Sequence, residues 1–98
     1  MSYSEIVTAD RRLLILRALA TAKDYTFGER LVASFLRSMG HAASHAAVAA
    51  DLDWLENEGL AQLQRAEGLT AARLTDRGLD VAEGRDRHSG VRRPEPGE

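Results

Sequence analysis

The stretch from Ser44 to Leu60, SHAAVAADLDWLENEGL, predicts one amphipathic helix with a marked beginning and end. Ser44 is a residue type that caps helices, and Gly59 favours the left-handed backbone with which helices commonly end. Between them, apolar residues recur at offsets of four and three, so they share one helix face. These residues are Val48, Leu52 and Leu55. We therefore predict a helix over residues 44–58 with these three side chains in the core.

The residues after this helix alternate between apolar and polar types, as a short β-hairpin does. The alternating runs are residues 60–65 and 69–74, with Gly68 between them. Thr75 then caps a last helix to about Arg85, in which Gly78 indicates the close approach of another backbone. Helix, hairpin and helix in this order predict the second half of a winged helix-turn-helix. Residues 44–58 are its recognition helix and residues 60–74 its wing.

Two more helices are predicted before this unit, after a frayed lead-in over residues 1–7. The first runs from Thr8 to about Asp24 and has a broad apolar face made mainly of leucines. The second begins at Thr26, because Thr26 and Glu29 are spaced as a capping box, and it ends at Gly40. The expected fold is therefore α+β and mostly helical, with three helices, a two-stranded hairpin and a fourth helix.

Length and composition limit the possibilities further. The chain has 98 residues, a net charge of −2 and no cysteine, which fits one small domain in a reducing compartment. No apolar run approaches the ~18 residues that a membrane span needs, so we expect a cytoplasmic protein without membrane contact. Residues 1–87 form the expected domain. Residues 88–98 hold both prolines and show no periodicity, so they are expected to form a flexible tail.

Charge is distributed unfavourably for DNA binding by the recognition helix. Residues 41–64 hold four acidic residues and no lysine or arginine, which gives 0 − 4 = −4. Such a segment repels phosphate, so DNA contacts must come mainly from arginines elsewhere. Arg65 and Arg73 flank the predicted hairpin and are expected to face each other across its base. They either reach the DNA backbone or minor groove, or are simply solvated charges on a hairpin.

Several parts of the chain together resemble the winged-helix superfamily. More closely, they are similar to a family of small proteins of Mu-like phages and prophages, usually labelled ArsR-type regulators. The matching parts include residues 12–19, 36–41, 50–55, 58–60, 74–85 and the tail residues 90–94. The resemblance implies the fold and a regulatory role. Two departures are the alanines Ala46, Ala47 and Ala49, where DNA readers usually carry polar or basic residues, and the absence of the cysteines that metal-sensing ArsR-type proteins use.

The leading hypothesis is a phage or prophage transcriptional regulator that binds duplex DNA. Ser44 at the helix start would engage a phosphate, while His45, Ala46 and Ala49 would lie against the bases. Arg65 and Arg73 would hold the flanking backbone. Arg92 and Arg93 would form either a minor-groove arm or an ordinary tail. A homodimer is expected, because the first helix has a wider apolar face than one small core covers. The alternative is a protein-interaction module whose alanine-rich helix docks a phage or host protein.

No residue pattern indicates catalysis or a metal site. His41 and His45 are four residues apart, but His41 precedes the helix cap and no third ligand follows nearby. Asp51 and Asp53 point roughly 200° apart on a helix, so they are expected to be ordinary surface or core-edge acids. Trp54 is expected in the core, with a partner-binding anchor as the alternative. We therefore expect neither an enzyme nor a cofactor or metal.

Overall fold

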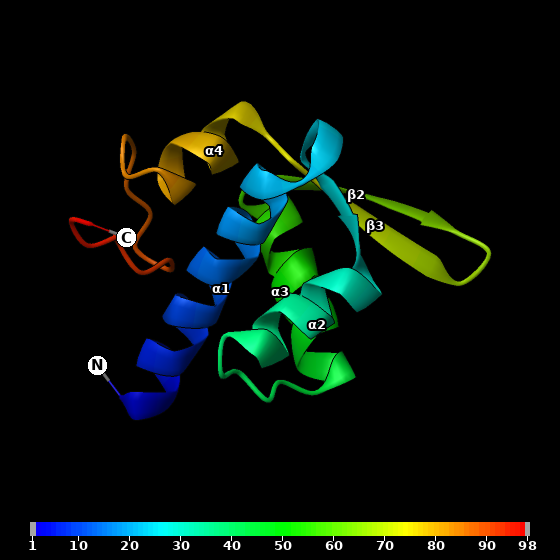
Figure 1. The fold of residues 1–98 in the computed structure, drawn as a ribbon, viewed down its shortest axis with the longest axis horizontal. Coiled ribbons are helices and arrows are strands. Elements are labelled where there is room, and N and C mark those ends of the chain that lie inside the picture. Colours follow the sequence, from blue (N-terminus) through cyan, green and yellow to red (C-terminus); the bar gives the residue numbers. More distant parts are fainter. Residues whose placement is uncertain (1, 98) are drawn as a thin grey trace.

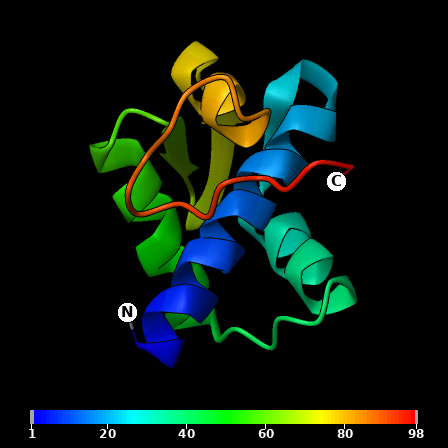
Figure 2. The same ribbon diagram turned by 90° about the vertical axis from the view of Figure 1, so that its left-hand side faces the viewer.

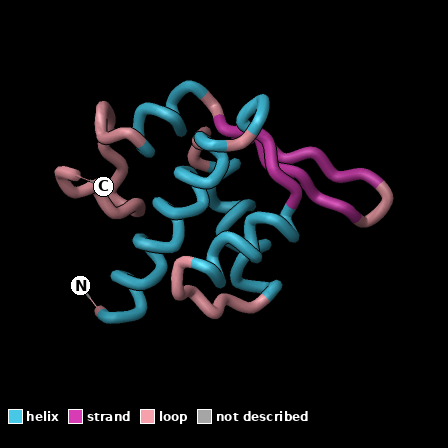
Figure 3. The backbone as a smooth tube through the Cα atoms, in the orientation of Figure 1, coloured by secondary structure: helices cyan, strands magenta, loops and turns pink. Residues whose placement is uncertain are grey.

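The structure is a computed structural model that describes residues 2–97. Its elements are α1 (Tyr3–Thr21), a 3-10 turn η1 (Lys23–Tyr25), β1 (Thr26–Gly28), α2 (Glu29–Ser38), α3 (His45–Asn57), β2 (Ala61–Ala66), β3 (Leu69–Leu74) and α4 (Asp76–Ala82). Helices α1, α2 and α3 form the body, and the β2–β3 hairpin projects from one side of it (Figures 1 and 3). Within residues 2–97, no helix is long and apolar enough to cross a membrane.

The predicted α+β layout of helices followed by a hairpin and a last helix is confirmed, but the sheet has one more strand than predicted. The strand order is β1-β3-β2, and both pairings are antiparallel. Thr26 was predicted to cap the second helix, whereas it begins β1 and its hydroxyl donates to the Asp24 carbonyl. β-Branched Thr26 and aromatic Phe27 suit a strand, and β3 offers them a pairing edge. Helix α2 therefore starts only at Glu29.

Helix α3 matches the prediction closely. The Ser44 hydroxyl accepts a hydrogen bond from the Ala47 N–H, and the turn after the helix includes Gly59 at φ +75°. The three predicted core residues, Val48, Leu52 and Leu55, are all fully buried. On the outer side, Ala46 and Asp53 are exposed as predicted, whereas Ala49 is half-buried. The apolar spacing alone therefore predicted which face of α3 is buried.

Helix α1 is longer than predicted, and its apolar face is covered within a single chain. It begins at Tyr3 rather than Thr8, because Ser2 caps it by accepting a hydrogen bond from the Glu5 N–H. Its large apolar residues pack against α2, α4 and β3. The buried ones are Leu13, Leu14, Ile15, Leu16 and Leu19. The width of this face therefore gives no argument for the expected homodimer.

Helix α4 sits against the root of the wing. Thr75 caps it as predicted, and the Gly78 N–H donates to the Thr75 hydroxyl. A Cβ at Gly78 would lie 2.0 Å from the Leu60 carbonyl oxygen, which confirms the predicted close backbone approach. The helix ends at Ala82, before the predicted Arg85, since Gly84 adopts a left-handed φ of +84°.

The C-terminal residues lie on the body, although a flexible tail was predicted from residue 88 onward. Figure 2 shows this segment crossing in front of α1. Val91 is only 7% exposed and joins the core, and the Arg92 N–H donates to the Ala9 carbonyl. We call residues 88–92 the C-terminal strap. The polar composition of residues 88–98 and their two prolines gave no indication that Val91 is buried.

Candidate functional site

The start of α3 and the wing form one continuous face of the molecule. Ser44, His45 and Ala46 are exposed at the first turn of α3. A groove of about 780 Å³ separates this end of the helices from the hairpin. It is lined by Arg30, His45 and the hairpin residues 64–71, among others. Of the residues predicted to contact DNA, the structure thus brings His45 and Arg65 to the same groove.

Asp51, the first acidic residue of α3, is buried rather than at the surface. It is 3% exposed, and its carboxylate accepts hydrogen bonds from Nε of Arg11 and, at 3.2 Å, from Nη2 of the same side chain. Arg12 Nε lies 3.6 Å from the other side of this carboxylate. A buried carboxylate needs such partners, because burial without them costs several kcal/mol. Asp51 therefore joins α3 to α1 and adds little negative charge to the surface.

The exposed acids of α3 are held by the wing. Arg65 Nη2 lies 2.5 Å from Asp53 Oδ1, and Arg65 Nη1 lies 3.9 Å from Glu56 Oε1. The Arg65 and Asp53 side chains are 55% and 58% exposed, so this pair contributes only ~0 to 1 kcal/mol to stability. A guanidinium held this weakly can exchange a carboxylate for a phosphate. Arg65 is therefore positioned beside α3, on the same face as His45.

Arg73 lies on the opposite face of the hairpin from Arg65, which corrects the prediction that the two face each other. Arg73 pairs with Gln62 and Arg65 pairs with Thr70, and cross-strand partners share a face. The two-residue turn at Glu67 and Gly68, both with positive φ, fixes this register. A turn placed later in the chain would be needed to bring the two arginines across from each other.

The two tail arginines lie far from the wing. Arg92 Nε is 2.5 Å from Asp10 Oδ1 on α1, and Arg93 follows it on the exposed side of the same segment. Figure 1 shows the C-terminal segment and the hairpin at opposite sides of the molecule. Arg92 and Arg93 are therefore not part of the face formed by α3 and the wing.

Known proteins similar to this chain come from a phage and a bacterium. The chain is 40% identical over 93 residues to gp26 of Escherichia phage Mu, an alignment that covers 95% of this chain and 96% of gp26. The chain belongs to the phage Mu gp26 family. It is also 38% identical over 80 residues to a Haemophilus influenzae protein, covering 81% of this chain and 78% of that protein. Both relatives are described only as uncharacterized. No protein-family model matches the chain.

A second cluster of interacting residues in this gp26-family protein surrounds Trp54. Trp54 is half-buried at the edge of the core, and the Arg12 guanidinium carbon lies 3.7 Å from the centre of its ring. The His88 ring meets Trp54 edge-on at 5.0 Å, while His88 Nε2 lies 2.7 Å from Glu58 Oε1. Sequence reasoning missed this cluster, since its members are far apart in the chain and form no motif.

Asp10 anchors the other end of the strap. Its carboxylate is 2.7 Å from His41 Nε2 and 2.5 Å from Arg92 Nε. Burial raises the pKa of Asp10, but hydrogen bonds and charges from His41 and Arg92 outweigh burial, so its pKa lies below the ordinary 3.8. His41 is thus engaged away from His45, and residues 2–97 contain no group of three or more side chains suited to hold a metal ion.

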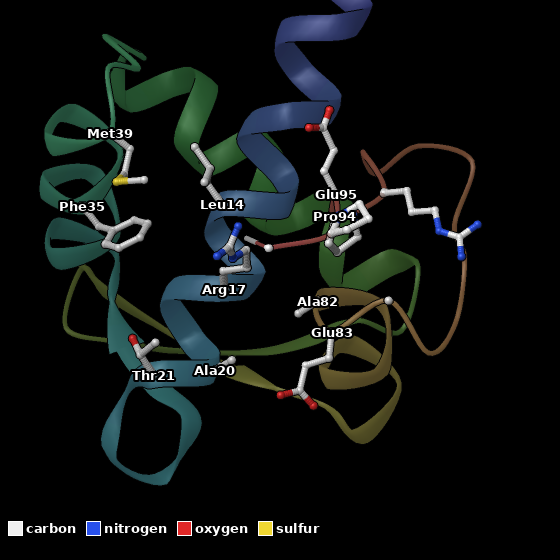
Figure 4. A pocket seen from close by; sticks show the side chains of 14 residues that line it. Leu14, Arg17, Ala20, Thr21, Phe35, Met39, Ala82, Glu83, Pro94 and Glu95 are labelled. Atoms are coloured by element: carbon white, nitrogen blue, oxygen red, sulfur yellow. The ribbon is translucent and has the colours of Figure 1, made fainter.

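The largest hollow in the described chain lies on a third side of the gp26-family protein. It measures about 1020 Å³ and is bounded by α1, α2, the end of α4 and the last residues of the structure (Figure 4). Leu14, Phe35 and Met39 give it an apolar lining, and Met39 is 52% exposed. Of the predicted DNA-contacting residues, only Arg93 lines it. Arg17, Glu83, Arg93 and Glu95 add charged side chains to this lining.

Proposed function

We propose that this phage-related protein is a cytoplasmic transcriptional regulator that binds duplex DNA with the start of α3 and the wing. One observation carries the proposal. All four acids in residues 41–64 have partners in the same chain: Asp51 with Arg11, Asp53 and Glu56 with Arg65, and Glu58 with His88. The negative charge that opposed DNA binding is therefore partly compensated, by Arg11 at Asp51 and by Arg65 at Asp53 and Glu56. What the first turn of α3 offers to a ligand is mainly free backbone N–H groups and small side chains.

In this mechanism the small side chains let α3 approach the floor of the major groove. The methyl group of Ala46 can contact thymine methyls, and His45 at the helix start can reach a base edge. Arg65 stays beside Asp53 and Glu56 and turns the exposed part of its guanidinium to a phosphate next to the groove. Arg73, on the other face of the hairpin, holds phosphates farther along the duplex. Ala49 is half-buried and has a smaller part, while Arg92 and Arg93 have none.

A homodimer remains part of the proposal, but its support has to come from binding data. Each phosphate contact lowers the slope of log K against log salt by about 0.9. One chain using Arg30, Arg65 and Arg73 gives a slope of about −3, and two chains give about −5. Sedimentation velocity at tens of micromolar, with and without duplex, measures the stoichiometry independently.

Fluorescence anisotropy with labelled duplexes at ~50 mM salt tests the proposal. We expect Arg65→Ala and Arg73→Ala each to weaken binding to all sequences several-fold and to flatten the salt slope by about one. His45→Ala should instead change the preference between sequences. Asp53→Asn should strengthen binding, because it frees Arg65 and removes a charge that repels phosphate.

Arg85→Ala is the matched control, since it removes one exposed arginine at the other end of the molecule, where Arg85 pairs with Asp80 and Glu83. Its effect should stay below about twofold. A parent protein that retains no duplex at ~50 mM salt contradicts the proposal. Equal losses for Arg65→Ala and Arg85→Ala would show a mere net-charge effect.

The second candidate is a protein-interaction module, and the apolar groove of Figure 4 favours it. Met39, just after α2, is 52% exposed and lines this groove with Leu14 and Phe35, so the groove offers a docking protein an apolar surface. Binding to a protein that is insensitive to salt, is weakened by Met39→Asp and is unaffected by Arg65→Ala would support this function instead.

A further inference from the structure

The C-terminal strap occupies a cleft where α1 meets α3. At one end, His88 contacts Glu58 and the edge of Trp54. In the middle, Arg12 Nη1 donates to the Gly90 carbonyl at 3.2 Å, and Val91 is buried. At the other end, Arg92 reaches Asp10. The strap is thus bound as a peptide with a turn would be: its Val91 N–H donates to its own His88 carbonyl, and the body supplies a backbone contact, one apolar position and two polar end positions.

The cleft selects what can occupy it. A Cβ at Gly90 would lie 2.5 Å from the Trp54 ring, so only glycine fits that position without a shift. The next position takes an aliphatic side chain, and the following one takes an arginine against the Asp10 carboxylate. Asp10 and Glu58 at the two ends repel phosphate and attract cationic groups. The cleft therefore suits a basic peptide and is unsuited to a nucleic acid.

The strap is packed less tightly than the core that it covers. A hollow of about 240 Å³ lies between the strap and the first turns of α1, lined by Ser89 and Gly90 among others. Another, of about 380 Å³, lies between the strap and α4. The linking residues Glu83 and Arg85 to Arg87 are exposed. A segment with one buried apolar side chain and exposed flanking residues is of the kind that opens locally while the domain stays folded.

We propose that the cleft between α1 and α3 is a peptide-binding site that the strap fills in the free protein. Its external ligand is a protein segment that forms the same turn and has the strap's own pattern, namely glycine against Trp54, then an aliphatic residue, then arginine. Such a segment displaces the strap and gains the same contacts. This site is separate from the face of α3 and the wing, so it does not depend on DNA binding.

A fluorescent peptide with the sequence of residues 86–97 is the probe, and full-length chains are the receptors. Gly90→Ala in the receptor expels its strap, so this receptor should bind the peptide at least tenfold more tightly than the parent, whose own strap competes. A second receptor, with Val91→Asp and Arg92→Ala together, should do the same. Peptides carrying Val91→Asp or Arg92→Ala should bind at least tenfold more weakly, and a scrambled peptide of equal charge controls for electrostatics.

Trp54 reports the state of the strap, because it is the only tryptophan in the sequence. Its emission should shift to longer wavelength in both receptor variants and return when peptide is added, while circular dichroism stays unchanged. The proposal is overturned if both variants show the shift and neither binds the peptide, or if the parent binds it equally well. Emission unchanged in both variants would overturn it too, since the strap would then not be releasable.

Discussion

The wing and the C-terminal strap are both non-helical, arginine-bearing segments, yet they meet the rest of the molecule in opposite ways. The wing satisfies its backbone hydrogen bonds by pairing β2 with β3, so it can project into solvent, and Leu69 near its tip is 62% exposed. The strap belongs to no strand, so it takes its contacts from α1 and α3, and Val91 is 7% exposed. Arg65 of the wing and Arg92 of the strap each pair with an aspartate, but the Arg65 side chain is 55% exposed and that of Arg92 only 30%, so the arginine of the self-sufficient segment is the more open to a ligand.

The largest effect is expected at the root of the wing. Gly78→Ala places a methyl group 2.0 Å from the Leu60 carbonyl oxygen, where only backbone movement relieves the clash. We expect the free energy of unfolding to fall by ~3 kcal/mol, measured by urea denaturation. This would show that the joint between α4 and the wing is rigid.

Gly68→Ala at the wing tip is the matched control. Gly68 has a φ of +77° but open space around its Cα, so only the cost of the left-handed backbone applies, about 1 kcal/mol. A Gly78→Ala protein as stable as the Gly68→Ala protein would mean that the close approach of α4 to Leu60 is absent in solution.

The next effect compares one aliphatic side chain from each segment. Val91→Ala should lower the free energy of unfolding by about 1–2 kcal/mol, because it removes two buried methyl groups. Leu69→Ala, on the exposed wing, should change it by less than about 0.5 kcal/mol. Thermal and urea unfolding of the two variants measure the difference directly. Equal effects of the two substitutions would mean that Val91 and Leu69 contribute alike to stability, contrary to their different burial.

The regular elements were predictable because local rules govern them. Ser44 as cap and the apolar spacing from Val48 to Leu55 set α3, and Thr75 with Gly78 set the start of α4. Strand β1 was missed because its three residues become a strand only when β3 is beside them, a long-range condition that a capping-box pattern cannot reveal.

The candidate site was predictable only in part. The exposed start of α3 follows from its helical phase, whereas the placement of Arg65 and Arg73 on opposite faces depends on a two-residue turn whose register shifts every partner. The pairing of Asp51 with Arg11 and the docking of Val91 join residues forty or more positions apart. No local pattern encodes such contacts. The sequence alone therefore overestimates how strongly the acids of α3 oppose DNA binding, because it does not show that Arg11 and Arg65 pair with three of them.

The smallest effect concerns the charge that anchors the strap. Since hydrogen bonds and charges from His41 and Arg92 hold the pKa of Asp10 below its ordinary 3.8, ionised Asp10 stabilises the folded chain above about that pH. The stabilisation is lost as the pH falls through the lowered folded-state pKa. Asp10 is 30% exposed, so the contribution should be less than ~1 kcal/mol.

Trp54 emission followed from pH 6 to pH 2 should show the parent strap loosening at the acid end. Asp10→Asn should already be partly loosened at pH 6 and should change less with pH, whereas Glu58→Gln should retain the Asp10-dependent part of the transition. Identical acid profiles for the parent and Asp10→Asn would mean that Arg92 does not rely on this carboxylate, and that Val91 and the contacts of His88 and Gly90 hold the strap.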